Sequence, residues 1–122
     1  MTSDVTEPPT LAADDFLTVA DDRFTTDSVA IVTGGASGIG RATAVALAAN
    51  GGTVVGVDRD EAGLAGTVDA AASVGAAGSV ETVGADLTDD AAVEAAVERA
   101  GEAGTLRYVA NVAGLQHIAP LA

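Results

Sequence analysis

The residues most suited to chemistry in this chain are three glycines, Gly34, Gly38 and Gly40. They follow residues 29–32, a β-branched apolar run typical of a buried strand, and precede residues 41–49, which are rich in helix formers. A glycine turn between a strand and a helix receives the free N–H groups and the positive dipole end of that helix. Such a turn suits a pyrophosphate, because a Cβ would hold the phosphates away from the backbone.

The spacing of the turn is T-G-x-x-x-G-x-G, starting at Thr33, and it differs from the general dinucleotide pattern G-x-G-x-x-G. A P-loop is excluded because it needs a Lys after its last glycine, and the chain contains no Lys. With Ile39 between the last two glycines, the turn resembles that of the short-chain dehydrogenase/reductase family, classical type. The resemblance implies an NAD-binding Rossmann domain in which the cofactor contacts Gly34, Ser37, Gly38, Ile39 and Gly40.

An acidic residue, Asp58, ends a second apolar run at residues 53–58. It stands 18 residues beyond Gly40, near the distance expected for the carboxylate that binds the adenosine ribose hydroxyls. A carboxylate there repels the 2′-phosphate of NADP and favours NAD. Arg59 follows directly and is able to accommodate that phosphate, but we expect the acid to decide. The neighbouring Asp60 is expected to be a turn residue.

The family resemblance continues at residues 85–89, Ala-Asp-Leu-Thr-Asp. This looks like the segment whose Asp side chain and following backbone N–H contact the adenine ring. The resemblance therefore implies that Asp86 and Leu87 belong to the cofactor site. Thr88 is expected to cap the next helix.

The end of the chain carries two further matches. Residues 111–114, Asn-Val-Ala-Gly, resemble an Asn-Asn-Ala-Gly segment of the family with its second Asn replaced, which implies nicotinamide-ribose contacts from Asn111, Ala113 and Gly114. The residues that follow look like those of D-3-hydroxybutyrate dehydrogenases, in which a Gln binds the substrate carboxylate. Gln116 is the substrate-site candidate, because an amide donates two N–H bonds without carrying charge. An ordinary polar loop residue remains the alternative.

The elements that must hold these residues alternate as β-α-β-α-β-α-β. Parallel strands joined by right-handed crossovers predict the strand order 3-2-1-4 with helices on both faces. The fold class is therefore α/β, the N-terminal half of a doubly wound parallel-sheet Rossmann fold. Gly63 and Gly66 are expected to weaken the second helix. The strands are expected near residues 29–32, 53–58, 80–86 and 106–112, and the helices near 41–49, 60–73 and 89–103.

Two regions are expected. Residues 1–27 hold seven acidic residues and predict a largely disordered N-terminal extension. Its second half, residues 11–20, is expected either to form a short helix docked on the domain or to be a solvated leader. Residues 28–122 are expected to form a truncated NAD-binding Rossmann domain.

No catalytic residue is predicted in this chain. The family uses a Ser and a Tyr-x-x-x-Lys beyond the fourth strand, whereas the one Tyr here, Tyr108, lies within that strand and no Lys follows it. The resemblance implies the NAD-binding part of an oxidoreductase acting on a small hydroxy acid, such as 3-hydroxybutyrate, or another secondary alcohol. The chain alone is expected to be inactive. A stand-alone NAD-binding or regulatory module and an inactive gene fragment remain alternatives.

Composition limits the partners. Eighteen acidic residues and five Arg give a net charge of −13, which disfavours nucleic acid and anionic membrane surfaces. The chain has no Cys, and no metal site is predicted. An acidic N-terminus without an apolar run of about 18 residues predicts a cytoplasmic protein. The excess of Asp and the absence of Lys resemble halophilic proteins, and an uncovered fourth strand leaves a homo-oligomer open.

Overall fold

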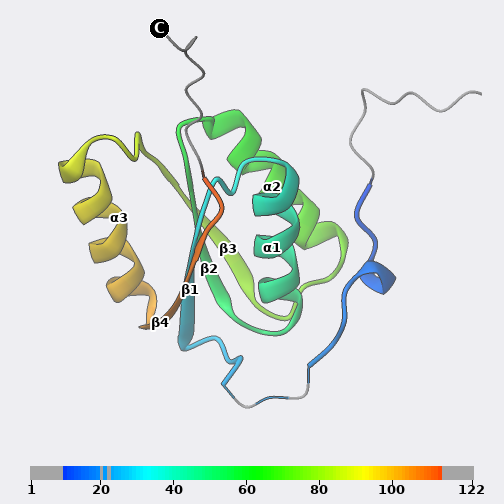
Figure 1. Ribbon diagram of the computed structural model, residues 1–122. Helices are drawn as coiled ribbons and strands as arrows, with labels where there is room; N and C mark the ends of the chain where they lie inside the picture. Colours follow the sequence, from blue (N-terminus) through cyan, green and yellow to red (C-terminus); the bar gives the residue numbers. More distant parts are fainter. Residues whose placement is uncertain (1–9, 20, 22, 114–122) are drawn as a thin grey trace, which may run out of the picture.

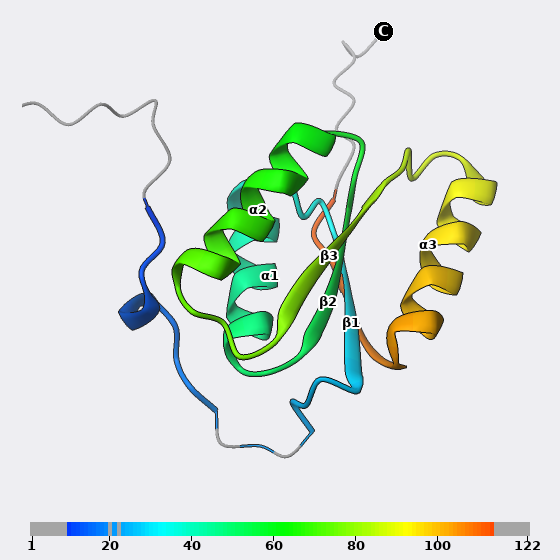
Figure 2. The ribbon, with the colours of Figure 1, turned by 180° about the vertical axis from the view of Figure 1, so that it is seen from behind.

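The computed structural model describes residues 10–19, 21 and 23–113. One parallel sheet in the order β3-β2-β1-β4 runs through it, so the predicted strand order is confirmed (Figure 1). Helices α1 and α2 cover one face of the sheet and α3 covers the other (Figure 2). The strands are β1 (Ser28–Thr33), β2 (Thr53–Asp58), β3 (Ser79–Gly84) and β4 (Thr105–Asn111), and the helices are α1 (Gly38–Ala49), α2 (Glu61–Ser73) and α3 (Asp90–Ala103).

The strands differ in burial according to their place in the sheet. All six residues of β1 are buried, and in β2 only the last, Asp58, is not fully buried. Central strands of a parallel sheet have helices over both faces, which is why these two read as continuous apolar runs. The edge strand β4 alternates between exposed and half-buried residues. None of the helices in the described ranges is long and apolar enough to cross a bilayer.

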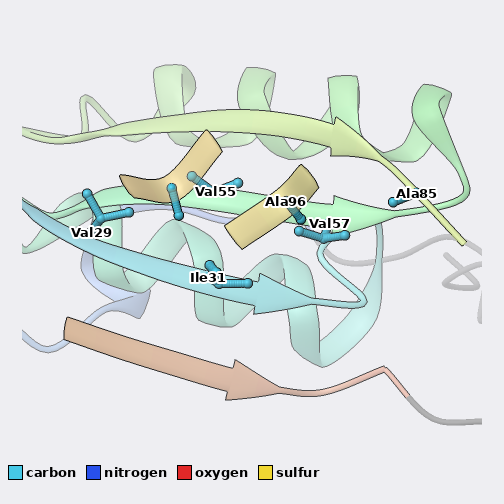
Figure 3. Packing of buried hydrophobic residues seen from close by; sticks show 7 residues of the cluster. Val29, Ile31, Val55, Val57, Ala85 and Ala96 are labelled. Atoms are coloured by element: carbon cyan, nitrogen blue, oxygen red, sulfur yellow. The ribbon is translucent and has the colours of Figure 1, made fainter. Parts of the chain in front are cut away.

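Two apolar layers hold the helices to the sheet. Figure 3 shows Val29 and Ile31 of β1 and Val55 and Val57 of β2 gathered against α3, which contributes Ala96. On the other face, valines of β1 and β2 pack against small residues of α1 and α2, among them Ala44, Val45, Ala48 and Ala71. Burying one Val side chain contributes about 1.5–3 kcal/mol, so the fully buried valines of β1 and β2 stabilise the packing of helices on both faces of the sheet.

Three predicted boundaries need correction. Helix α1 begins at Gly38, within the glycine motif, rather than at Arg41. Strand β3 ends at Gly84 and not near Asp86, because β2, its neighbour in the sheet, pairs with it no further than Gly84. The helix cap assigned to Thr88 is wrong: Asp89 is the N-cap of α3, and its side chain accepts a hydrogen bond from the N–H of Ala91 at 3.0 Å.

Residues 10–19 lie against the domain on the side of α1 and α2. In place of the expected helix over residues 11–20, the described residues contain one 3-10 turn, Ala13–Asp15, because so short a segment gains too little from helix propagation. Leu11 and Phe16 pack on the apolar layer beneath α1 and α2. The amide of Asn50 accepts a hydrogen bond from the N–H of Val19 at 2.6 Å and donates to the carbonyl of Leu17 at 3.0 Å. Whether residues 1–27 are largely disordered stays a prediction.

Candidate functional site

A cavity of about 600 Å³ opens at the carboxyl edge of the sheet. Its walls come from the turn after β1, the first turn of α1, the end of β2 and the segments after β3 and β4. In a doubly wound sheet, ligands bind in the crevice where the strand order reverses, which here lies between β1 and β4. The lining residues are Gly34, Ser37, Ile39, Gly40, Asp58, Arg59, Ala85, Asp86, Leu87, Thr88, Val112 and Ala113.

Backbone atoms approach the glycine turn so closely that two of its glycines have no room for a side chain. Gly34 has a φ of +70°, and a Cβ there would lie 2.9 Å from the backbone nitrogen of Ala113. A Cβ on Gly40 would collide with the carbonyl oxygen of Gly34. Gly40 is therefore needed to pack the first turn of α1 onto the glycine turn. That packing brings the free N–H groups of the helix terminus to the cavity wall, where they suit an anionic group.

Asp58 is held at the end of β2 by two backbone donors. Its Oδ2 accepts a hydrogen bond from the N–H of Ala36 at 3.2 Å, and its Oδ1 accepts one from the N–H of Asp60 at 3.0 Å. The carboxylate thus faces the cavity in a defined orientation. Asp60 itself is the N-cap of α2 and accepts a hydrogen bond from the N–H of Gly63 at 2.9 Å, which agrees with its expected turn role.

Asp86 is also oriented, on the segment after β3 that lies beside the end of β2, where the N–H of Ala85 donates to the carbonyl of Asp58 at 3.0 Å. The hydroxyl and the N–H of Thr88 donate to its Oδ1 at 2.7 and 2.9 Å, and together they hold the pKa of Asp86 below its ordinary value. Its other oxygen lies 3.6 Å from a guanidinium nitrogen of Arg59. Asp86 therefore presents an ionised carboxylate at neutral pH. The guanidinium of Arg59 lies within ion-pair distance of it.

The segment after β4 is joined to β1 through one hydroxyl. Thr33 Oγ1 accepts hydrogen bonds from the N–H groups of Val112 and Ala113 at 3.1 and 3.2 Å, and lies 3.4 Å from the carbonyl of Ala110. Thr33, the first residue of the glycine motif, thus sets the position of the segment after β4, which lines the cavity.

Most of the residues expected at the cofactor site come together in this cavity. Gly38 and Asn111 are described but do not line it: Gly38 begins α1 and Asn111 ends β4 with an exposed side chain. Gly114 and Gln116 lie outside the described residues. Three lining residues, Ala85, Thr88 and Val112, were not expected there. Each neighbours a predicted site residue in the chain, and that adjacency was the available signal.

Comparisons with known proteins agree with this geometry. Residues 28–122 match the family model described as short chain dehydrogenase. The chain is 47% identical over 89 residues to 1-deoxy-11-beta-hydroxypentalenate dehydrogenase of Streptomyces avermitilis, a match that covers 72% of this chain and 32% of that protein. This match, like the one to levodione reductase of Leifsonia aquatica, spans about a third of the length of the relative.

Solved structures are similar as well. Glucose dehydrogenase of Caenorhabditis elegans, in its apo form, is 37% identical with a TM-score of 0.68, covering 77% of this chain and 40% of its own. Carveol dehydrogenase of Mycobacterium avium, in complex with NAD, is 27% identical with a TM-score of 0.64, covering 72% and 36%. The matched region carries the glycine turn and the dinucleotide-binding sheet, so the chain belongs to the short-chain dehydrogenase family.

Proposed function

We propose that this chain is the NAD-binding part of an oxidoreductase that acts on a secondary alcohol. The observation that carries the proposal is the Asp58 carboxylate, fixed on the cavity wall by the N–H groups of Ala36 and Asp60. A carboxylate in that place accepts hydrogen bonds from two ribose hydroxyls and repels a 2′-phosphate. The cavity volume and the N-terminus of α1 beside it also suit a dinucleotide. Bound NAD supplies the hydride acceptor.

Arg59 is the rival for cofactor choice, since a guanidinium binds phosphate well. Its side chain is 75% exposed and lies 3.6 Å from Asp86, so its charge is shared with a second carboxylate. The pair is weak because both groups are solvated. Asp58, by contrast, is oriented by two backbone donors, which supports NAD as the cofactor. The likeness to carveol dehydrogenase in complex with NAD supports the same choice.

We expect NADH to bind at least about tenfold more tightly than NADPH, a difference of about 1.4 kcal/mol. Replacing Asp58 with Ala is expected to narrow that gap, because it removes the repulsion of the 2′-phosphate. Fluorescence titration of both cofactors in molar KCl measures it. Asp69→Ala, which removes an exposed carboxylate of α2 outside the cavity, is the matched control. Equal affinities in the unaltered chain would mean that Arg59 outweighs Asp58.

The substrate proposal rests on the resemblance alone. A small hydroxy acid, 3-hydroxybutyrate among them, is proposed because Gln116 matches a carboxylate-binding Gln. Gln116 lies outside the described residues, so its support is its place in the sequence two residues after Gly114. The partners proposed for the chain are accordingly a small molecule, and neither nucleic acid nor membrane, with a homo-oligomer open.

We also propose a halophilic, cytoplasmic setting from the charge of −13. The folded fraction, measured by far-ultraviolet circular dichroism, is expected to grow from 10 mM to molar KCl. Over that range the screening length falls from about 30 Å to about 3 Å, which weakens the repulsion among carboxylates. Salt also weakens ion pairs such as Arg99–Glu81, at 2.9 Å, but an exposed pair contributes at most about 1 kcal/mol. Repulsion among eighteen carboxylates outweighs that loss. A circular dichroism signal that is the same at both KCl concentrations contradicts the proposal. So does an equal gain of signal when sucrose is added in place of KCl.

A further inference from the structure

A guanidinium group holds the glycine turn on the side that faces α2. Arg41 lies in the first turns of α1, and its side chain reaches α2. Helices α1 and α2 cover the same face of the sheet (Figure 1). One terminal nitrogen, Nη2, donates to the carbonyl of Ala36 at 2.6 Å and to the carbonyl of Gly63 at 2.8 Å, while Nε donates to Thr67 Oγ1 at 3.1 Å. All three acceptors are neutral oxygens, although the chain is rich in carboxylates. The guanidinium therefore joins α1, α2 and the glycine turn at one point.

Thr67 extends this contact to the next peptide of the turn. Its side chain is fully buried in α2 and its hydroxyl lies 2.6 Å from the carbonyl of Gly35. Because Arg41 Nε already donates to this hydroxyl, the hydroxyl hydrogen is free to point at Gly35, and the 2.6 Å separation is that of a strong O–H···O bond. The carbonyls of Gly35 and Ala36, consecutive in the chain, are thus both bound on the side away from the cavity.

Holding those carbonyls also aims the N–H groups of the same peptides. In a trans peptide the C=O and the N–H point in opposite directions. The N–H that shares a peptide with the Gly35 carbonyl belongs to Ala36, and it donates to Asp58 Oδ2 at 3.2 Å. The N–H that shares a peptide with the Ala36 carbonyl belongs to Ser37, a residue of the cavity wall. Arg41 and Thr67 therefore act, through two rigid peptides, on the groups that face the cavity.

Two glycines of α2 make room for this arrangement. A Cβ on Gly66 would lie 2.6 Å from Nη2 of Arg41, and its other near neighbours are atoms of the same guanidinium. A Cβ on Gly63 would lie 2.8 Å from the Cβ of Ala36 and 2.9 Å from its carbonyl oxygen. The glycines that weaken α2 as a helix are thus the positions at which α2 and the guanidinium approach the turn.

We propose that Arg41 and Thr67 are positioning residues that set the preference of the site for NAD over NADP. Thr67 binds the carbonyl of the Gly35–Ala36 peptide, whose N–H orients the Asp58 carboxylate. Arg41 holds that peptide through the Thr67 hydroxyl and through the carbonyl of Ala36. The inference rests on the proposed function, because it concerns how that same site discriminates between the two cofactors. A carboxylate that rotates freely discriminates less well than one held in place before the ligand arrives.

The decisive variant is Gly66→Ala. The added Cβ meets only the far end of the flexible Arg41 side chain, so the guanidinium is displaced while the chain still folds. The preference, defined as the Kd for NADPH divided by the Kd for NADH, is expected to fall from at least about tenfold to about threefold or less. Gly101→Ala in α3 is the matched control, because a Cβ there meets nothing within 4 Å.

Arg41→Met removes the same contacts by a second route, with Arg99→Met as the control for the lost charge. The double variant Gly66→Ala with Arg41→Met is expected to show the same preference as Arg41→Met alone, since the two changes act through one group. Thermal melting by circular dichroism is recorded for every variant. A partly unfolded sample weakens both affinities by the same factor, so their ratio reports the site and not the folded fraction.

Gly66→Ala and Arg41→Met proteins that keep the wild-type ratio, whatever happens to their melting temperatures, would overturn the inference and leave Arg41 a structural residue. A wild-type chain that binds neither cofactor, or both equally, overturns the proposed function together with this inference. A Gly66→Ala effect that adds to that of Arg41→Met in the double variant also contradicts it, because the glycine would then act by another path.

Discussion

Gly40→Ala is expected to lower the free energy of unfolding by about 3 kcal/mol and to abolish measurable NADH binding. The added Cβ would collide with the carbonyl oxygen of Gly34 and lie 3.2 Å from the nitrogen of Gly35. Both atoms are backbone atoms of the glycine turn, so relief requires α1 to move away from β1. That movement withdraws the helix N-terminus from the cavity and leaves a pyrophosphate without its donors.

Urea denaturation and NADH titration, both in molar KCl, measure the two effects of this change. Gly101→Ala is the control, because the same methyl group enters open space in α3. It is expected to leave binding unchanged and to stabilise the chain by up to about 1 kcal/mol through helix propensity. If Gly40→Ala matches the control in both measurements, the close contact between α1 and the glycine turn does not support the site.

Leu64→Ala is expected to lower the free energy of unfolding by about 2–5 kcal/mol. Leu64 is 1% exposed and is among the largest fully buried side chains in the described ranges. Its Cδ2 occupies the space left by two glycines, 3.6 Å from where a Cβ would stand on Gly35 and 3.4 Å from where one would stand on Gly56. Truncation leaves a cavity directly beneath the glycine turn, and the rigid backbone there has no side chain with which to fill it.

The shift of the urea midpoint measures this loss. Val97→Ala in α3 is the control, because Val97 is 47% exposed and its truncation is expected to lower the stability by less than about 1 kcal/mol. Equal midpoints for the two variants would show that the space under the turn collapses readily. NADH affinity is expected to weaken with Leu64→Ala, since the turn loses its support.

The sequence by itself determined the type and order of the main elements, and it predicted most of the residues that line the cavity. Continuous valine runs and right-handed crossovers were sufficient to predict the order β3-β2-β1-β4. The glycine turn and Asp58 were predictable because each is marked by local chain spacing, and strands that run parallel deliver their ends to one edge. Boundaries were less predictable: Gly38 opens α1 and Asp89 caps α3, since the competing caps differ little in energy.

Only the tertiary structure decided which residues hold the site in shape. Arg41 reads in the sequence as a helix former and Gly66 as a helix breaker, and neither has a local signal for the other, 25 residues away. Asn50, which directly follows the helix predicted at residues 41–49, binds the backbone of residues 17 and 19. These contacts arise where α1 and α2 pack on one face of the sheet and where residues 17 and 19 meet the C-terminal end of α1. A periodic pattern shows which face of a helix is buried, but the atoms that meet there depend on how the packed elements approach one another.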